Sequence, residues 1–562
     1  MEELKEIQTR NELADYIKVP RQKLSYILYV KGTENLYKSF EIPKKSGGVR
    51  HIHAPEEELK QIQSKLAKVL YEYALKIEKN NGKKWNIAHA FVKGKGCFTN
   101  AKIHRNKRIL VNVDLKDFFD SFHFGRVRGY FMKNRNYQLS EEVATVIAQI
   151  ACYKGKLPQG APTSPVITNL ICGIFDIRIL HLAKKYRLDY TRYADDLTFS
   201  TNDKKFQIYQ EQFLEELTNE ISKAGFSINQ NKTRVQYRDS HQEVTGIVVN
   251  KKLNVIRKYY KDTRAMAYNL YKTGEYTIDG EKKGSIQQLE GRFSYINQFD
   301  KYNNKLGLEK HQFEYLNGRE RAYSQFLFYK YFLANDKPLI ITEGKTDIIY
   351  LKAALKKMWK EYPEFIAKNE KGQFEYKISF LKRSKRIEYF LNIKTDGADT
   401  LNNIMEFYGG SGNPKYSKYI KYLKKISDRK PSNIVVLMFD NELENKESPI
   451  SKFSRRWLKG KQDELKKENW LYMQDNLYVA TTPLVPEYDQ TDIEMLFDEE
   501  IQNIEIDGRT LDKSGKKDKE KYFNKEIFSK YIMKNYDNID FENFKPIFEN
   551  LKEMIISIKK NE

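Results

Sequence analysis

The stretch Asp189–Ser200, DYTRYADDLTFS, decides the fold of the first half of the chain. Asp195 and Asp196 stand side by side between two short runs in which aromatic and β-branched residues alternate with polar ones. This pattern predicts a β-hairpin with both acids at its tip. Adjacent carboxylates repel each other, and Mg²⁺, which prefers carboxylate oxygens, would remove that repulsion. A solvated acidic turn explains the stretch equally well in isolation, so the other motifs decide.

Composition limits the classes of protein to consider. A chain of 562 residues predicts roughly two to four domains. Its net charge of +23 indicates a polyanionic partner, most often nucleic acid, although a merely basic protein is the alternative. Cys97, Cys152 and Cys172 are isolated, which argues against a disulfide framework or a zinc site. We recognise no signal peptide and no apolar run of membrane-spanning length, so we expect a cytoplasmic protein without a membrane partner.

A strand and a basic hairpin precede the acidic pair. Phe40 and Ile42 alternate as a strand that leads into the turn KKSGG and back through Arg50. Such a hairpin suits gripping phosphates, although an ordinary exposed turn is the alternative. Ile109–Val113 alternates as a second strand that brings Asp114 to its end, beside aromatic bulk. We therefore expect Asp114 to join the acidic pair.

Further blocks follow on both sides of the hairpin. Gln159 and Gly160 lie in a loop that leads into an apolar helix, where Gly allows close approach of a ligand to the backbone. Phe206–Gly225 has the apolar spacing of an amphipathic helix, and Lys232 lies in the strand-and-turn segment after it. Together, the three aspartates supply the acids of a two-metal site, in which Mg²⁺ activates a sugar hydroxyl and holds a triphosphate leaving group.

The order of these blocks resembles that of reverse transcriptases: IPKKSGGVRHI, VNVDLKDFF, LPQGAPTSP, YADD, NQNKT and VTG. Within that superfamily the chain looks most like retron reverse transcriptases, because Asn100–His104 is similar to their NAxxH block and Val244–Gly246 to their VTG block. Group II intron and diversity-generating enzymes explain these two blocks less well. The resemblance implies an α+β right-hand polymerase with fingers, palm and thumb.

The resemblance also implies roles for single residues. Asp114 and Asp195 would bind the catalytic Mg²⁺ ions, with Asp196 supporting them, and Phe119 would exclude a ribose 2′-OH. The incoming dNTP would contact Lys45, Arg50, Gln159, Gly160 and Lys232, the last as a proton donor to pyrophosphate. The RNA and its DNA product would contact Asn100, His104, Val244, Thr245 and Gly246.

A second domain is predicted to begin near Lys337. The apolar strands LIIT and IVVLMF lead directly to Glu343 and to Asp440, and strands of this type alternating with helices predict a parallel sheet with ligands at the strand ends. EGKTD and FDNE resemble the metal-binding blocks of a Toprim domain. That resemblance implies one or two further Mg²⁺ ions held by Glu343, Asp347, Asp440 and Glu442, with Glu343 and Asp440 as catalytic residues. Glu442 departs from the more usual Asp, and we expect Glu494 on the surface.

The predicted fold class is thus a right-hand polymerase followed by an α/β Toprim domain with a mainly parallel sheet. We expect fingers and palm over 1–250, a basic helical thumb over 251–330, the Toprim domain over 331–500 and a charged, helical extension over 501–562.

A reverse transcriptase joined to a Toprim domain resembles one type of retron. The implied function is an RNA-directed DNA polymerase that starts from a 2′-OH and copies part of its own structured noncoding RNA into a branched RNA–DNA hybrid, msDNA. The Toprim domain would be an effector nuclease in antiphage defence, restrained by the msDNA, with DNA or RNA, including tRNA, as its target. An oligomer is possible. The alternatives are a catalytically silent Toprim interaction module and a reverse transcriptase that is not from a retron.

Overall fold

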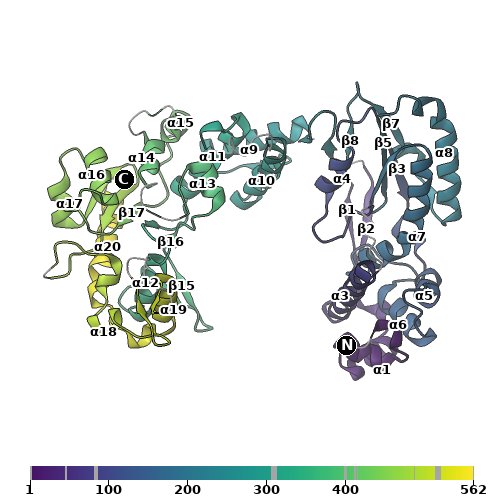
Figure 1. The fold of residues 1–562 in the computed structure, drawn as a ribbon, viewed down its shortest axis with the longest axis horizontal. Helices are drawn as coiled ribbons and strands as arrows, with labels where there is room; N and C mark the ends of the chain where they lie inside the picture. Colours follow the sequence, from purple (N-terminus) through teal and green to yellow (C-terminus); the bar gives the residue numbers. More distant parts are fainter. Residues whose placement is uncertain are drawn as a thin grey trace. The chain divides into compact units, whose positions relative to one another are not determined.

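The structure is a computed structural model that describes residues 3–44, 47–80, 87–304, 313–395, 397, 401–409, 413, 415–486, 488–512 and 521–560. The chain separates into two compact units, Met1–Ile256 and Arg257–Glu562, each of which is described by itself (Figure 1).

The first unit surrounds an antiparallel sheet. Its helices are α1 (Arg10–Tyr16), α2 (Arg21–Ser25), α3 (Glu57–Asn80), α4 (Cys97–Ile103), α5 (Phe124–Lys133), α6 (Glu141–Ala151), α7 (Ser164–Lys185) and α8 (Phe206–Lys223). Its strands are β1 (Tyr37–Pro43), β2 (Val49–Pro55), β3 (Ile109–Lys116), β4 (Asp189–Tyr193), β5 (Asp196–Thr201), β6 (Ser227–Ile228), β7 (Arg234–Tyr237), β8 (Glu243–Val244), β9 (Ile247–Val248) and β10 (Asn254–Val255). The predicted hairpin around the acidic pair and the predicted helix after it are confirmed.

The sheet of the first unit has the order β4-β5-β3-β6, and β7 also pairs with β3. Phe199 of β5 stacks on Tyr190 of β4 with ring centroids 4.9 Å apart. Phe213 of α8 packs edge-on against the ring of Phe199, with centroids 5.1 Å apart. The helices α7 and α8 thus bury one face of the sheet by aromatic packing (Figure 1). This packing fixes the strands that carry the acids.

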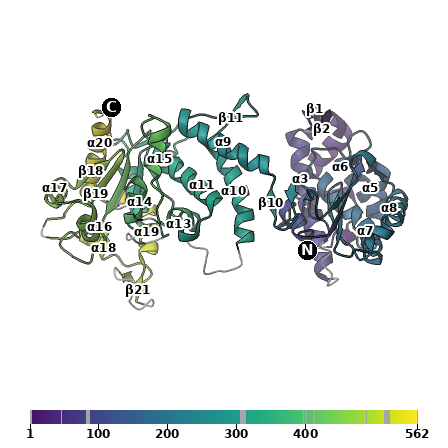
Figure 2. The same ribbon diagram turned by 90° about the horizontal axis from the view of Figure 1, so that it is seen from above.

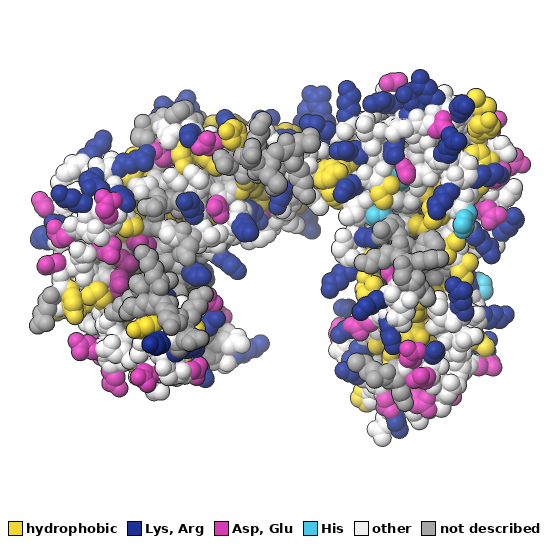
Figure 3. Space-filling model, in the orientation of Figure 1, with side chains coloured by type: hydrophobic (Ala, Val, Ile, Leu, Met, Phe, Trp, Pro, Cys, Tyr) yellow, Lys and Arg dark blue, Asp and Glu magenta, His cyan; other side chains and the backbone are white. Residues whose placement is uncertain are grey.

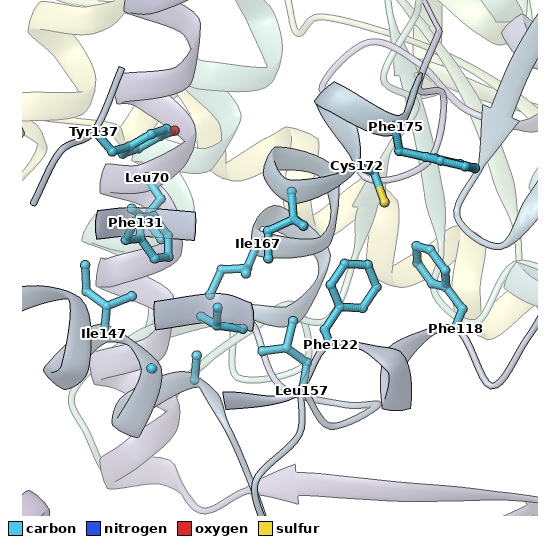
Figure 4. Close-up of a cluster of buried hydrophobic side chains, with 14 of the residues drawn as sticks. Leu70, Phe118, Phe122, Phe131, Tyr137, Ile147, Leu157, Ile167, Cys172 and Phe175 are labelled. Carbon is cyan, nitrogen blue, oxygen red and sulfur yellow. The ribbon is translucent and has the colours of Figure 1, made fainter. Parts of the chain in front are cut away.

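Another part of the same core holds a group of aromatic and aliphatic side chains (Figure 4). Phe118 packs edge-on against Phe122 at 5.0 Å, and both contact Phe226. Cys172 is buried in the same cluster, and all three cysteines are free, as their spacing predicts.

Helix α7 differs from the sequence expectation. By length and composition it is the one helix in the described part of the chain that could cross a membrane, whereas we recognised no such apolar run in the sequence. Half of this apolar window is buried in the first unit, where Ile167 and Phe175 belong to the core. Packing of this kind is typical of a core helix.

The second unit contains a second five-stranded sheet and many helices (Figure 2). Its helices are α9 (Arg257–Thr273), α10 (Ile286–Asn303), α11 (Gly318–Phe328), α12 (Asp347–Lys357), α13 (Lys385–Leu391), α14 (Asn402–Tyr408), α15 (Tyr419–Ile426), α16 (Pro449–Trp457), α17 (Gln462–Glu468), α18 (Glu499–Gln502), α19 (Lys525–Lys534) and α20 (Lys545–Lys560). Its strands are β11 (Thr277–Ile278), β12 (Lys282–Lys283), β13 (Leu339–Thr342), β14 (Ile366–Lys368), β15 (Phe374–Tyr376), β16 (Ser379–Phe380), β17 (Val435–Phe439), β18 (Trp470–Gln474), β19 (Leu477–Thr481), β20 (Thr510–Leu511) and β21 (Tyr522–Phe523).

The main sheet of the second unit has the order β16-β13-β17-β19-β18. All its pairings are parallel except that of β18 with β19, so the predicted mainly parallel sheet is confirmed. One face shares a core with α9, α10 and α11, in which Phe293 and Phe326 cluster with Leu437 of β17. The other face is covered by α12, α19 and α20, in which Tyr350 packs against Phe528. The predicted boundaries near 330 and 500 therefore lie within shared cores, and the domain division stays a prediction.

Candidate functional site

The three aspartates of the first unit converge at one end of its sheet. Strand β3 pairs with β5 so that Asp114 lies opposite Asp196. Asp195 lies in the β4–β5 turn, after Ala194 with φ 56°, and its carbonyl accepts a hydrogen bond of 3.0 Å from Leu115 N. The pairing thus brings together acids from segments far apart in the sequence, as the sequence predicts.

Charge is concentrated around these acids. Asp114 accepts hydrogen bonds from Lys232 Nζ at 3.0 Å and from Asn229 Nδ2 at 3.0 Å. Burial raises the pKa of Asp195, and Asp114 adds to this rise. Burial, with repulsion from Asp195 and Asp114, raises the pKa of Asp196 to about 7. Two carboxylates that resist ionisation beside a third favour a divalent cation, so the donor set fits Mg²⁺.

A buried ion pair supports the hairpin from inside the protein. Arg192 of β4 is fully buried and donates from Nε and Nη2 to the two oxygens of Asp176 on α7, each at 2.8 Å. Its Nη1 donates to the carbonyl of Ala194 at 3.2 Å, and Tyr190 Oη donates to Asp176 at 3.0 Å. We did not predict this pair from the sequence. Its signal in the sequence is an Arg among the aromatic and β-branched residues of a predicted strand.

The structure describes the surroundings of four more residues expected at the nucleotide, Arg50, Phe119, Gln159 and Gly160. His53 N donates to Gln159 O at 2.8 Å, so the Gln159–Gly160 loop is attached to β2. Gly160 has φ 121°, and a Cβ there would lie 2.9 Å from His53 O, so only glycine fits this close approach. Burial raises the pKa of Asp195, and the charge of Arg50, exposed on β2, is near enough to oppose that rise slightly. Phe119 is half-buried in a short 3₁₀ turn, Phe119–Ser121, and Lys45 lies outside the described residues.

The two blocks expected to bind RNA have different surroundings. Thr245 and Gly246 form the β8–β9 turn with φ 47° and 82°, and they line a cleft together with Asp114, Asp196 and Lys232. Val244, next to them, is buried.

Asn100 and His104 are fully buried, with 0% of each residue exposed. His104 bridges Ser200 Oγ at 2.8 Å and Thr191 Oγ1 at 2.7 Å, and burial lowers its pKa to about 3. The expectation of direct RNA contact does not fit Asn100, His104 and Val244, because their side chains face the core. His104 holds the two hairpin strands through these bonds, whereas Thr245 and Gly246 remain accessible.

A second acidic centre lies at the carboxyl ends of β13 and β17. Glu343 follows β13, Asp440 follows β17, and Asp440 N donates to Glu343 Oε2 at 3.3 Å. Asp347 begins α12 and accepts from Gly344 N at 2.7 Å. Burial, followed by repulsion from Asp347 and Glu442, raises the pKa of Glu343 to about 7. Burial and neighbouring acids raise the pKa of Asp440 as well.

The C-terminal segment completes this centre. Asp440 Oδ1 accepts from Ile493 N at 3.1 Å, and the next residue, Glu494, is 0% exposed. The expectation of a surface Glu494 is therefore wrong. Lys525 of α19 lies 2.9 Å from Glu494 Oε2; burial lowers the pKa of Lys525, but Glu494 and the other acids raise it overall, to about 12. Lys525 gave no sequence signal, because it lies in a Lys-rich tail.

Both centres fit Mg²⁺ by donor type and by their excess of negative charge. Within the described ranges, however, no group of three or more His, Cys, Asp or Glu side chains has the arrangement of a metal site.

An antiparallel sheet with facing aspartates and a further aspartate at a hairpin tip is the arrangement expected of a two-metal polymerase. The family profile described as "Reverse transcriptase (RNA-dependent DNA polymerase)" matches residues 42–316, which places this part of the chain among reverse transcriptases. Retron Ec86 reverse transcriptase of Escherichia coli is 31% identical over 294 residues, which cover 52% of this chain and 85% of that protein. The chain belongs to the retron reverse transcriptase family.

The alignments with two other relatives cover a smaller share of each relative's own length. Retron Mx65 reverse transcriptase of Myxococcus xanthus is 35% identical over 251 residues, which cover 41% of this chain and 55% of that protein. Retron Mx162 reverse transcriptase of the same organism is 33% identical over 330 residues, which cover 53% of this chain and 65% of that protein.

Among solved structures, telomerase from Candida albicans aligns with a TM-score of 0.32 and 11% identity, over 52% of this chain and 60% of that chain. The foamy viral protease-reverse transcriptase with double-stranded DNA aligns with a TM-score of 0.28 and 10% identity, over 80% and 66%. At these scores neither alignment adds to the assignment. The family profile ends at residue 316, before the second acidic centre.

Proposed function

We propose that the chain is the RNA-directed DNA polymerase of a retron, which copies part of its own structured noncoding RNA into msDNA from a 2′-OH. The observation that carries the proposal is the pairing of Asp114 with Asp196, with Asp195 in the adjoining turn. The cleft that holds Asp114 and Asp196 is also lined by Lys232 and Thr245. Membership of the retron family supports the choice of RNA as template.

The residues of the chain divide the work of nucleotide addition. Mg²⁺ held by Asp114, Asp195 and Asp196 would supply activation of the primer hydroxyl and neutralisation of the triphosphate. Lys232, with Nζ 3.0 Å from Asp114 Oδ2, is the proposed proton donor to the leaving pyrophosphate. Arg50 contributes positive charge for the triphosphate, and the half-buried ring of Phe119 limits the room for a 2′-OH. Gln159 and Gly160, whose loop packs closely against β2, would line the nucleotide pocket.

Asp195→Asn tests this assignment. We expect the variant to keep its fold but to lose msDNA in cells and primer extension on RNA with purified protein. Asp189→Asn is a matched control, because Asp189 lies on the same hairpin, is exposed and pairs with Lys107 away from the acids. Full msDNA from Asp195→Asn, or equal loss from both variants, would overturn the proposal.

We also propose that the second acidic centre is a Toprim-type, Mg²⁺-dependent nuclease. It is supported by Glu343 and Asp440 at the ends of adjacent parallel strands, with Asp347 and Glu442 as neighbouring acids. In this proposal msDNA restrains the nuclease until infection, as an effector of antiphage defence. Its target is DNA or RNA, tRNA included, and sequencing of cleaved ends from infected cells would identify which.

A silent interaction module is the competing function for this half. Glu343→Ala separates the two, because a nuclease loses protection against phage while msDNA synthesis continues, whereas a silent module keeps both. Glu370→Ala is the control, since Glu370 is an exposed acid on the β14–β15 turn. The remaining proposals are a cytoplasmic site of action, dNTPs and the cognate RNA as partners, and an oligomeric state to be measured by light scattering.

A further inference from the structure

We propose that a groove between α9 and α15 is a binding site for single-stranded nucleic acid, distinct from both acidic centres. The groove lies within the second unit, where α9 and α15 are in contact and α11 lies close to both (Figures 1 and 2). One wall belongs to the segment expected as the thumb, and the other to the C-terminal half. The site does not depend on either centre being catalytic.

The lining of the groove has one sign of charge. Four cations line it, Lys261 and Arg264 from α9, Arg321 from α11 and Lys418 at the start of α15. No acid occurs among the described residues of the lining. Lys261, Arg264 and Lys418 are exposed and make no ion pair within the described ranges, in contrast to the neighbouring Lys258, which pairs with Asp262. Unpaired cations in a cleft without acids favour a polyanion.

Exposed aromatic rings lie in the same groove. Tyr268 of α9 is 42% exposed and Tyr422 of α15 is 44% exposed, and both line it. Such rings, when they are not needed for the core, offer flat faces on which unpaired bases stack. Lys261, Arg264 and Tyr268 are spaced by three and four residues, so they share one face of α9. A row of cations beside stacking rings matches a single strand, because a duplex hides its base faces.

The two walls are fastened to each other. Ser427 Oγ, after α15, donates to Lys272 O of α9 at 3.0 Å, and Arg429 Nη1 donates to Thr273 O at 2.8 Å. Tyr419 of α15 donates to Ser324 of α11 at 2.8 Å. Lys and Arg are abundant over the visible surface (Figure 3), but this groove is lined by residues of α9, α10, α11 and α15 and of the segment just before α15. The two walls are therefore joined by hydrogen bonds, and a strand held in the groove would touch both halves of the second unit.

The test measures binding of labelled single-stranded oligonucleotides, dT and U, to the full chain by fluorescence anisotropy across a salt series. Replacing Lys261, Arg264 and Lys418 with Gln removes three cations. Each phosphate contact to a single strand contributes about 0.7 to the slope of log K against log salt, so the magnitude of the slope should fall by about 2. Replacing Tyr268 and Tyr422 with Ser should weaken binding about tenfold or more per stacked base without changing the slope. Photo-crosslinking of iodouridine oligonucleotides should label Tyr268 or Tyr422.

A matched control is Tyr472→Ser with Lys467→Gln, because Tyr472 on β18 is 47% exposed and lies outside the groove. All replaced side chains are exposed, so melting temperatures should stay at the wild-type value. An unchanged slope and affinity in the groove variants, equal losses in the control, or loss of duplex binding alone would overturn the proposal. Primer extension by the wild type and by the same variants distinguishes failure of the groove proposal from failure of the polymerase proposal. If the polymerase proposal fails, the wild type itself will be inactive in primer extension.

Discussion

Replacement of Asp176 by Asn tests how the acidic hairpin is held. Arg192 is 0% exposed, and its guanidinium donates to both carboxylate oxygens of Asp176 at 2.8 Å. Its Nη1 donates to the carbonyl of Ala194. Removing one charge from a buried pair costs about 3–5 kcal/mol, since the remaining charge stays buried without compensation. Asn keeps one acceptor oxygen, and the bond to Ala194 is unaffected, so we expect the lower end, about 3 kcal/mol.

A cost of about 3 kcal/mol corresponds to about a hundredfold change in an equilibrium constant, at 1.4 kcal/mol for each factor of ten. We expect hydrogen exchange of the amides over 189–201 to accelerate by about this factor, because local opening of β4 and β5 exposes them. Primer extension should fall as well, since Asp195 and Asp196 are carried by the same hairpin. Mass spectrometry of peptic fragments measures the exchange without requiring a two-state unfolding transition of a chain with two units.

Asp203→Asn is the control for this experiment. Asp203 pairs with Arg187 at 3.6 Å, and the side chain of Arg187 is 82% exposed, so the pair contributes about 0–1 kcal/mol. Exchange in Asp176→Asn within threefold of the wild type would refute the reasoning. Equal acceleration in Asp203→Asn would refute it too, because it would mean that burial of the pair is unimportant.

Three further predictions concern other parts of the first unit. Gly160→Ala should raise the KM for dNTPs and cost about 1–3 kcal/mol of local stability, because φ is 121° and the new Cβ meets His53 O. Gly129→Ala on α5, without a positive φ and with open space around it, is the control in steady-state kinetics. The free energy of opening the part of the first unit around His104 should fall by about 1.6 kcal/mol between pH 6.5 and pH 5, since His104, with its folded pKa lowered to about 3, takes up a proton only on unfolding. His104→Gln should show a smaller fall when amide hydrogen exchange is measured at each pH. Millimolar Mg²⁺ should raise the melting temperature of the wild type, and the rise should be smaller in Asp195→Asn; an equal rise in both would place the bound ion elsewhere.

Much of the first unit could be predicted because its signals are local. The alternation in DYTRYADDLTFS and the aromatic residues around it specify a hairpin, and the strand before Asp114 has the same period. The convergence of Asp114 with the hairpin followed from the order of the blocks rather than from spacing. The parallel sheet of the second unit was predictable for a similar reason, since LIIT and IVVLMF are short, wholly apolar and followed by acids.

The features that could not be predicted depend on tertiary packing. His104 has the sequence neighbourhood of a surface residue, yet its ring bridges Ser200 and Thr191 in the core. Glu494 looks like a solvated acid, but the chain folds so that Lys525, from a charged tail, pairs with it at 2.9 Å. In each case the partner is supplied by a segment far away in the sequence, and a charge run gives no period from which that contact could be deduced.

The two acidic centres have a common physical design. In the first, burial and repulsion raise the pKa of Asp196 to about 7, and in the second the same causes raise the pKa of Glu343 to about 7. Each centre also has one lysine beside an acid, Lys232 at Asp114 and Lys525 at Glu494. A fold gains nothing in stability from crowding carboxylates that resist ionisation, and one lysine does not neutralise the group. The crowding is explained if each centre is completed by a divalent cation, which makes both of them candidates for chemistry rather than for structure.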